Sequence, residues 1–286
     1  MAIGLSVAAI VVLAQTTDWD PIRARPLEEV RLFLENQYAK PVTYEDPVWR
    51  WAGDSVARGS EPDGPFGRWL WDRHLDLPRG VTREENSGLT ATLLQRILDA
   101  YRQQNPGDTR FQVVQSSLGL HIIPAFAHDE NGSLVKASSL LDTTITVPLA
   151  ARMPSEHLRA LCQAVGGAAG AKVDLSAKWV DRFFAPNRAV PRYEAARLLT
   201  AEEKERYSFR WGASGVPARE ALIGLIDSSN TTLTWALLCQ PSLKPQNRSC
   251  TLNVAPLQLT REGPDGKPIQ KALSYDRCGA CEFLHR

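Results

Sequence analysis

The sequence predicts an α+β protein made of two repeated small modules, each a mixed β-sheet packed with two helices. Residues 26–44 and 155–175 share one plan, an amphipathic helix that leads directly into a hydrophobic strand. A second helical pattern, at residues 94–99, recurs at residues 222–227. The chain has 286 residues, which is the length of about two typical domains.

The spacing of apolar residues supports the repeat. Leu27 is followed after 15 residues by Val42. Leu158 is followed after the same interval by Val173. Because the interval spans a helix and a strand in both places, we interpret the two segments as copies of one unit.

The first module is expected at residues 22–127. Pro47 ends its first strand, and residues 48–88 are rich in Gly, Pro, Asp and Arg. This composition indicates a long excursion with one or two short strands. The other predicted elements are a helix at 27–37, a strand at 42–44, a helix at 89–104 and two strands at 111–116 and 120–126.

The second module is expected at residues 140–258. A charged excursion at 176–205 interrupts it, with a helix predicted at 191–206. Pro217 suits the first turn of a further helix, where its missing N–H is not needed. The other predicted elements are a strand at 144–147, a helix and strand within 158–175, a strand at 208–211, a helix at 218–227 and two strands around Trp235 and Leu252; residues 259–286 are predicted to be a tail.

The first 14 residues form an uncharged apolar run with the length of a signal-peptide core. Small residues before Gln15 fit a cleavage site. We therefore expect residues 1–14 to be a signal peptide, the mature chain to be periplasmic or secreted, and no membrane span to remain after its removal. No cysteine follows the run, so a lipoprotein is not indicated.

Charge and cysteine content narrow the class of partner. With 33 basic and 32 acidic residues, the chain has no net field to attract nucleic acid. Cys239 and Cys250 flank a loop between two strand-like runs, so a hairpin would place them within reach of a disulfide. Cys162 lies on an apolar helix face and is expected to be core.

The order helix, strand, excursion, strand, helix and hairpin resembles the short N-terminal domain of secretins and TonB-dependent receptors. The fullest match is at residues 144–257, where the helix at 218–227 is followed by a Trp-bearing strand at 233–238. The chain also resembles hypothetical secreted bacterial proteins that carry this unit twice. The resemblance implies a periplasmic module that contacts partner proteins, although no secretin ring or outer-membrane barrel follows the second copy. Such a fold has open sheet edges, which can accept a strand from a partner.

No hydrolase or metal signature is complete. Ser214 lies in a Gly-Ala-Ser-Gly run, but Val216 stands where a nucleophile elbow needs glycine. Asp142 lacks the glycine of an aspartic protease motif, and the five histidines are scattered. Glu45 and Asp46 are adjacent, so on a strand they point to opposite faces and cannot act together as an acid and base. We expect no catalytic residue, cofactor or metal.

The best candidate for reactive or metal-binding chemistry is the C-terminal cluster of Cys278, Cys281 and His285. Its spacing fits a redox dithiol or three ligands of a metal site. An oxidising compartment disfavours free thiolates, and no thioredoxin-like strand and helix precede the cluster. We favour a local structural disulfide and keep an envelope redox or metal-binding function as the alternative.

Two tryptophan doublets suggest a binding face. Trp49 and Trp51, and likewise Trp69 and Trp71, place two indoles on one side of a strand. Exposed, they would stack on sugars, which makes glycan binding a further alternative. Because tryptophan is mostly buried, we favour core packing.

Taken together, the sequence predicts a noncatalytic exported bacterial cell-envelope protein that acts by binding a protein partner. It assigns no small-molecule ligand.

Overall fold

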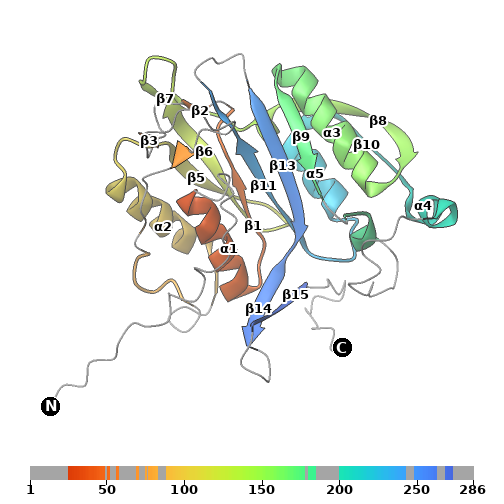
Figure 1. Ribbon diagram of the computed structural model, residues 1–286, viewed down its shortest axis with the longest axis horizontal. Helices are drawn as coiled ribbons and strands as arrows, with labels where there is room; N and C mark the ends of the chain where they lie inside the picture. Colours follow the sequence, from red (N-terminus) through yellow and green to blue (C-terminus); the bar gives the residue numbers. More distant parts are fainter. Residues whose placement is uncertain are drawn as a thin grey trace.

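The structure, a computed structural model, has a central mixed sheet with helices on both faces (Figure 1). It describes residues 25–48, 50–51, 56–57, 69–70, 75, 77–82, 88–177, 180–184, 200–242, 248–262 and 268–272. The α+β class is confirmed. The predicted signal peptide at residues 1–14 lies outside the described residues.

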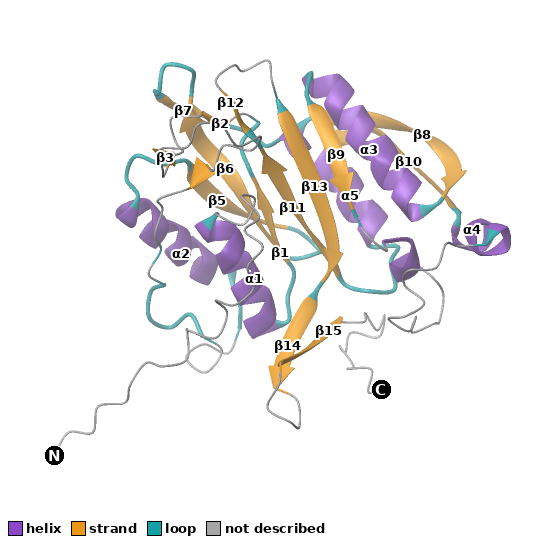
Figure 2. Cartoon of the chain, in the orientation of Figure 1, coloured by secondary structure: helices purple, strands orange, loops and turns teal. Residues whose placement is uncertain are grey.

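The central sheet runs through both predicted modules (Figure 2). Its strands lie in the order β5 (Arg110–Gln115), β6 (Leu120–His128), β1 (Val42–Glu45), β11 (Leu233–Cys239), β13 (Ser249–Pro256) and β9 (Lys172–Ser176), and β7 (Leu134–Lys136) pairs with β6 away from this path. The two predicted modules therefore meet in one continuous sheet.

Strand pairing follows the same scheme in the two halves of the sheet. In the first half β1 runs parallel to β6, which is antiparallel to β5. In the second half β9 runs parallel to β13, which is antiparallel to β11. The halves join where β1 pairs parallel with β11. Because of this joint, β9 and β13 run opposite to β1 and β6.

The helices cover opposite faces of the two halves. On one face lie α1 (Pro26–Tyr38) and α2 (Ala91–Gln104), and on the other lie α3 (Pro154–Ala169) and α5 (Ala218–Ile226). Strand β11 contributes to both cores because successive side chains alternate between faces. Its Trp235 and Leu237 pack in the core that includes α3 and α5, whereas Ala236 and Leu238 pack in the core that includes α1 and α2.

A two-stranded sheet covers α3 and α5 on their far side. It is formed by β8 (Thr144–Arg152) and β10 (Phe209–Pro217), which pair antiparallel. The buried Ile145 and Val147 of β8 belong to the same core as Leu158 and Leu222. The remaining described elements are η4 (Leu140–Asp142), η5 (Val180–Phe184), α4 (Ala201–Tyr207) and the strand pairs β2 (Arg50–Trp51) with β12 (Pro241–Ser242), β3 (Val56–Ala57) with β4 (Trp69–Leu70) and β14 (Gln258–Glu262) with β15 (Pro268–Ala272).

Local sequence explains where the helices begin and end. The Thr90 hydroxyl accepts the Leu93 N–H at 3.1 Å and so caps α2. Glu156 accepts the Met153 N–H at 3.0 Å at the start of α3. Gly170 ends α3 with φ of 62°, a left-handed conformation that glycine adopts without a steric penalty.

Some predicted segments differ from the structure or lie partly outside the described residues. The excursion at 48–88, expected to hold one or two short strands, contains β2, β3 and β4, each of two residues. The expected tail contains a hairpin, in which β14 pairs antiparallel with β15. The hydrophobic pattern of this segment is weak, so it did not indicate the strands. The helix predicted at 191–206 is described only as α4, because residues 185–199 lie outside the described residues. Within the described chain, no helix is both long and apolar enough to cross a membrane.

The predicted disulfide between Cys239 and Cys250 is confirmed and links directly opposed residues of β11 and β13. Its ends are separated by 11 residues. Replacing both cysteines with alanine should lower the free energy of unfolding by about 2–3 kcal/mol, because the unfolded chain regains the freedom of that loop. Urea unfolding measures the loss. Cys162→Ala is the control for thiol removal alone, and equal midpoints for the wild type and the double variant would contradict the expectation.

Candidate functional site

A buried ion cluster joins the two halves of the sheet. Arg219, at the start of α5, donates to both carboxylate oxygens of Glu45 at 2.8 and 2.6 Å. It also donates to Asp142 at 2.7 Å. The Glu45 side chain is fully buried, and Trp235 Nε1 adds a bond to its Oε1 at 3.3 Å. The bidentate geometry gives the buried carboxylate a strong, oriented partner.

Asp46 forms a second buried cluster on the other side of the same strand end. Its carboxylate accepts from Tyr44 Oη at 2.7 Å and from the Cys239 N–H at 2.8 Å. Arg25 pairs with it at 2.8 Å and also donates to the Cys239 carbonyl at 2.8 Å. Adjacent carboxylates therefore serve separate networks, as the alternation of a strand requires.

His121 occupies the same face as Glu45 and is fully buried. One ring nitrogen lies 2.8 Å from Thr43 Oγ1 and the other lies 2.7 Å from Ser116 Oγ. The ring stacks on Trp235 with centroids 5.2 Å apart. Burial lowers the pKa of His121 to about 4, and the positive charge of Arg219 acts in the same direction.

The Ser116 and His121 pair has the spacing of a nucleophile and its base, but its environment does not suit catalysis. An imidazole with a pKa of about 4 is a weak base at neutral pH. Ser116 Oγ also accepts the Leu118 N–H at 3.1 Å, which holds it in the turn between β5 and β6. The pair therefore has a structural role.

The incomplete catalytic motifs have structural explanations. Ser214 lies in β10, paired with β8, and not on a strand-to-helix turn. Asp142 ends η4 and binds Arg219. Cys162 is buried in the core, where burial raises the pKa of its thiol to about 12 and the charge of Asp174 acts in the same direction. Within the described ranges, no three His, Cys, Asp or Glu side chains are placed to hold a metal.

Several predicted site residues lie where the structure gives no side-chain description. Cys278, Cys281 and His285 of the C-terminal cluster lie outside the described residues. The same holds for Trp49 and Trp71. Their partners in the doublets, Trp51 and Trp69, lie in β2 and β4, but their side chains are not described. The redox, metal and glycan alternatives thus stay predictions.

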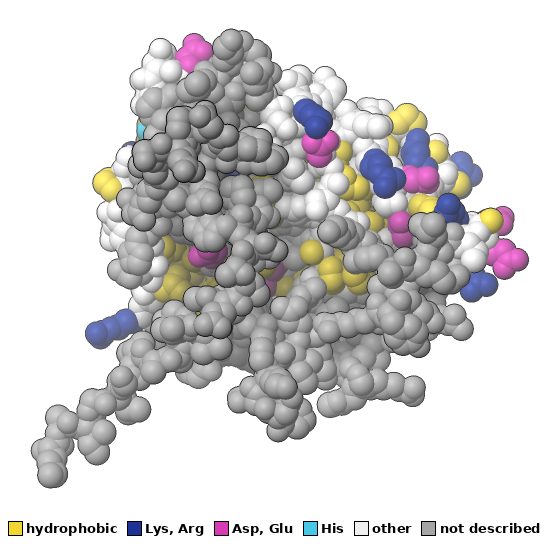
Figure 3. Space-filling view, viewed as in Figure 1, with side chains coloured by type: hydrophobic (Ala, Val, Ile, Leu, Met, Phe, Trp, Pro, Cys, Tyr) yellow, Lys and Arg dark blue, Asp and Glu magenta, His cyan; other side chains and the backbone are white. Residues whose placement is uncertain are grey.

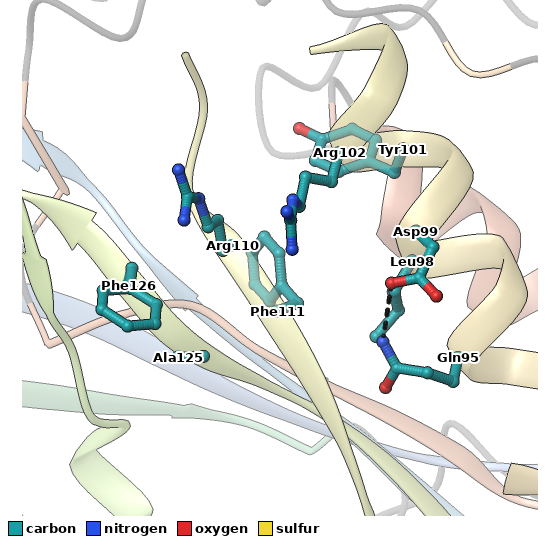
Figure 4. A pocket seen from close by; sticks show the side chains of 9 residues that line it. All are labelled: Gln95, Leu98, Asp99, Tyr101, Arg102, Arg110, Phe111, Ala125 and Phe126. Carbon is teal, nitrogen blue, oxygen red and sulfur yellow. Dashed lines mark hydrogen bonds between the residues drawn. The ribbon is translucent and has the colours of Figure 1, made fainter. Parts of the chain in front are cut away.

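A small hollow opens between the end of α2 and the strands β5 and β6 (Figure 4). Its volume is about 150 Å³. Figure 4 shows Phe111 between the side chains of Arg102 and Arg110, with Phe126 beyond Arg110. The lining residues come from α2 (Gln95, Leu98, Asp99, Tyr101, Arg102), β5 (Arg110, Phe111) and β6 (Ala125, Phe126).

The charged side chains that line the hollow differ in whether they have a polar partner. Asp99 is already held by Gln95 Nε2 at 3.1 Å. Arg110 lies over the Phe126 ring, 5.7 Å from its centroid, and its buried Nε has no hydrogen-bond partner. Across the described residues, neither Arg102 nor Arg110 forms an ion pair. The hollow is therefore a place where an added anion would be stabilised.

The hollow adjoins an end of the central sheet as the described strands form it. β5 is the end strand of the central sheet, and among the described residues it pairs only with β6. Two polar side chains of β5, Gln112 and Gln115, are exposed. Elsewhere, acidic and basic side chains are interspersed over the right-hand part of the face in Figure 3, so that part of the face has no single-sign patch.

Sequence reasoning missed both the ion clusters and the hollow. Arg25 and Arg219 have partners that are far away in the sequence and that only the fold brings close. Arg25 and the Cys239 carbonyl are 214 positions apart, and Arg219 and Glu45 are 174 positions apart. The Gln95 and Asp99 pair, four residues apart on a helix, was the local signal available. No protein-family model, curated protein or solved structure matches this chain.

Arg219→Met should lower the free energy of unfolding by about 3–5 kcal/mol, because it leaves the Glu45 carboxylate buried and unpaired. Denaturant unfolding measures the change. The matched control is Lys172→Met, which breaks a 2.7 Å pair with Asp174 whose side chains are 71% and 51% exposed. That control should cost less than about 1 kcal/mol. Equal losses in the two variants would contradict a special role for the buried cluster.

The stability of the protein should fall as the pH drops from about 6.5 to about 4. The pKa of His121 is near its ordinary value of 6.5 in the unfolded chain and about 4 in the folded chain. Between these two values the unfolded chain binds a proton at His121 that the folded chain does not bind. The free energy of unfolding therefore rises with pH here, by up to about 3 kcal/mol from this group. His121→Gln does not titrate and should flatten this part of the profile in urea unfolding. An unchanged slope would count against the assignment.

Proposed function

We propose that the protein is a noncatalytic protein-interaction module of the exported bacterial cell envelope, similar in role to the short N-terminal domains of secretins and TonB-dependent receptors. The observation that carries the proposal is the edge of β5, which among the described strands pairs only with β6, beside the arginine-lined hollow. An edge strand offers unpaired main-chain groups, and an adjacent hollow offers a place for a side chain of the partner.

The use of polar groups inside the protein supports a binding role. Glu45, Asp46 and His121 are buried groups with the chemistry of catalysis, and each is bound by neighbouring side chains or main chain. Groups held in this way stabilise the fold and are not available to a substrate. On the described surface, the edge of β5 and the arginine-lined hollow are available to bind a partner.

Two further observations agree with the proposal. The second half has the element order β8, α3, β9, β10, α5, β11 and β13, which is the order on which the resemblance rests. The disulfide between Cys239 and Cys250 is compatible with export to an oxidising compartment.

Site-specific crosslinking tests the proposal. A photo-reactive amino acid at Gln112, an exposed position of β5, should give one discrete adduct with a partner protein in cells that produce the chain. The same group at Arg159, an exposed position of α3, should not. Excess purified chain should compete for the adduct. No adduct at Gln112, or the same adducts at both positions, would contradict binding at the β5 edge.

A further inference from the structure

The size of the hollow identifies the kind of group it admits. Sites for cofactors and small ligands usually measure roughly 300–1,000 Å³. At about 150 Å³, this hollow is too small for such a molecule but has room for one side chain. Its position next to β5 means that the side chain would come from a segment lying along that edge.

The charge of the hollow identifies the chemistry of that side chain. Arg102 and Arg110 approach it from α2 and from β5, on either side of Phe111 (Figure 4). Asp99, the acidic residue of the lining, is already bound to Gln95. The buried Nε of Arg110 lacks a hydrogen-bond acceptor. A carboxylate supplies acceptors for two guanidinium groups, and a hydrogen bond to a charged group is among the stronger ones.

The aromatic residues explain how the remainder of the side chain is held. Phe126 is 39% exposed and lies under the Arg110 guanidinium. The aliphatic part of a Glu or Asp side chain can pack on this ring while its carboxylate meets the arginines. A nucleic acid fits less well, because a base and its phosphate exceed the volume of the hollow.

We propose that β5 binds an acidic segment of a partner protein as an added strand, with one carboxylate side chain inserted between Arg102 and Arg110. This rests on the proposed protein-interaction function and names the chemistry of its partner. Main-chain hydrogen bonds along β5 supply affinity, and the hollow selects for the acid.

Fluorescence anisotropy with the full chain tests this directly. The probe is a labelled peptide of about eight residues in which Val and Glu alternate, a length that matches an ordinary strand. It should bind at least about 10-fold tighter than the same peptide with Gln in place of Glu. Arg102→Gln and Arg110→Gln should each weaken binding of the Glu peptide by about 10-fold. Arg159→Gln carries the same charge change away from the hollow and should leave binding unchanged.

Each alternative has its own outcome. Equal binding of the Glu and Gln peptides would overturn the role of the carboxylate. Equal binding of a backbone N-methylated Glu peptide would overturn strand addition, since it cannot pair along β5. Tighter competition by oligothymidine, or no binding of the Glu peptide below about 1 mM, would overturn the proposal as a whole.

The crosslinking experiment separates this inference from the proposed function. If the adduct at Gln112 persists in Arg102→Gln and Arg110→Gln, a partner binds the edge without the carboxylate, and only the further inference fails. If no adduct forms in the wild type, the protein-interaction function itself fails. Circular dichroism and unchanged urea midpoints verify that each variant is folded.

Discussion

The architecture depends on the buried pair of Arg219 and Glu45 at the joint between the two halves of the sheet. Strand β1 meets β11 over a register of only two residue pairs, Tyr44 with Ala236 and Glu45 with Leu237. So short a ladder gives little stability by itself, and the charged pair adds a contact that is satisfied only when the halves are aligned. A buried charge that loses its partner is costly, so the cluster also penalises other registers.

The same joint makes the two cores interdependent. Ala236 and Leu238 belong to a strand of the second half but fill the core under α1 and α2. Thr234 Oγ1 donates to the Val42 carbonyl at 3.0 Å across the joint. Trp235 contacts both Glu45 and the His121 ring, which belong to the first half. The first half therefore lacks part of its core until β11 has paired with β1.

Much of the fold was predictable because periodicity is local. The helices at residues 27–37 and 218–227, and the opposed strands that carry Cys239 and Cys250, lie where the pattern of apolar residues placed them. The reversal of the helix-covered face was not predictable, since it depends on the direction in which β11 pairs with β1. The ion clusters and the hollow were missed for the same reason. A lone Arg219 or Arg110 carries no sequence signal until distant segments meet.

Because corresponding strands run in opposite directions on the two sides of the joint between β1 and β11, the two ends of the sheet are not equivalent. Strand direction and the helix-covered face both change between the halves, so the sheet has two unlike ends. One end presents β5 with its arginine-lined hollow, and the other presents β9 with the exposed charges of Lys172 and Asp174. Two copies cannot bring equivalent hollows together by extending the sheet from β9. A strand added beside β5, as proposed, would therefore meet side chains that a strand added beside β9 would not.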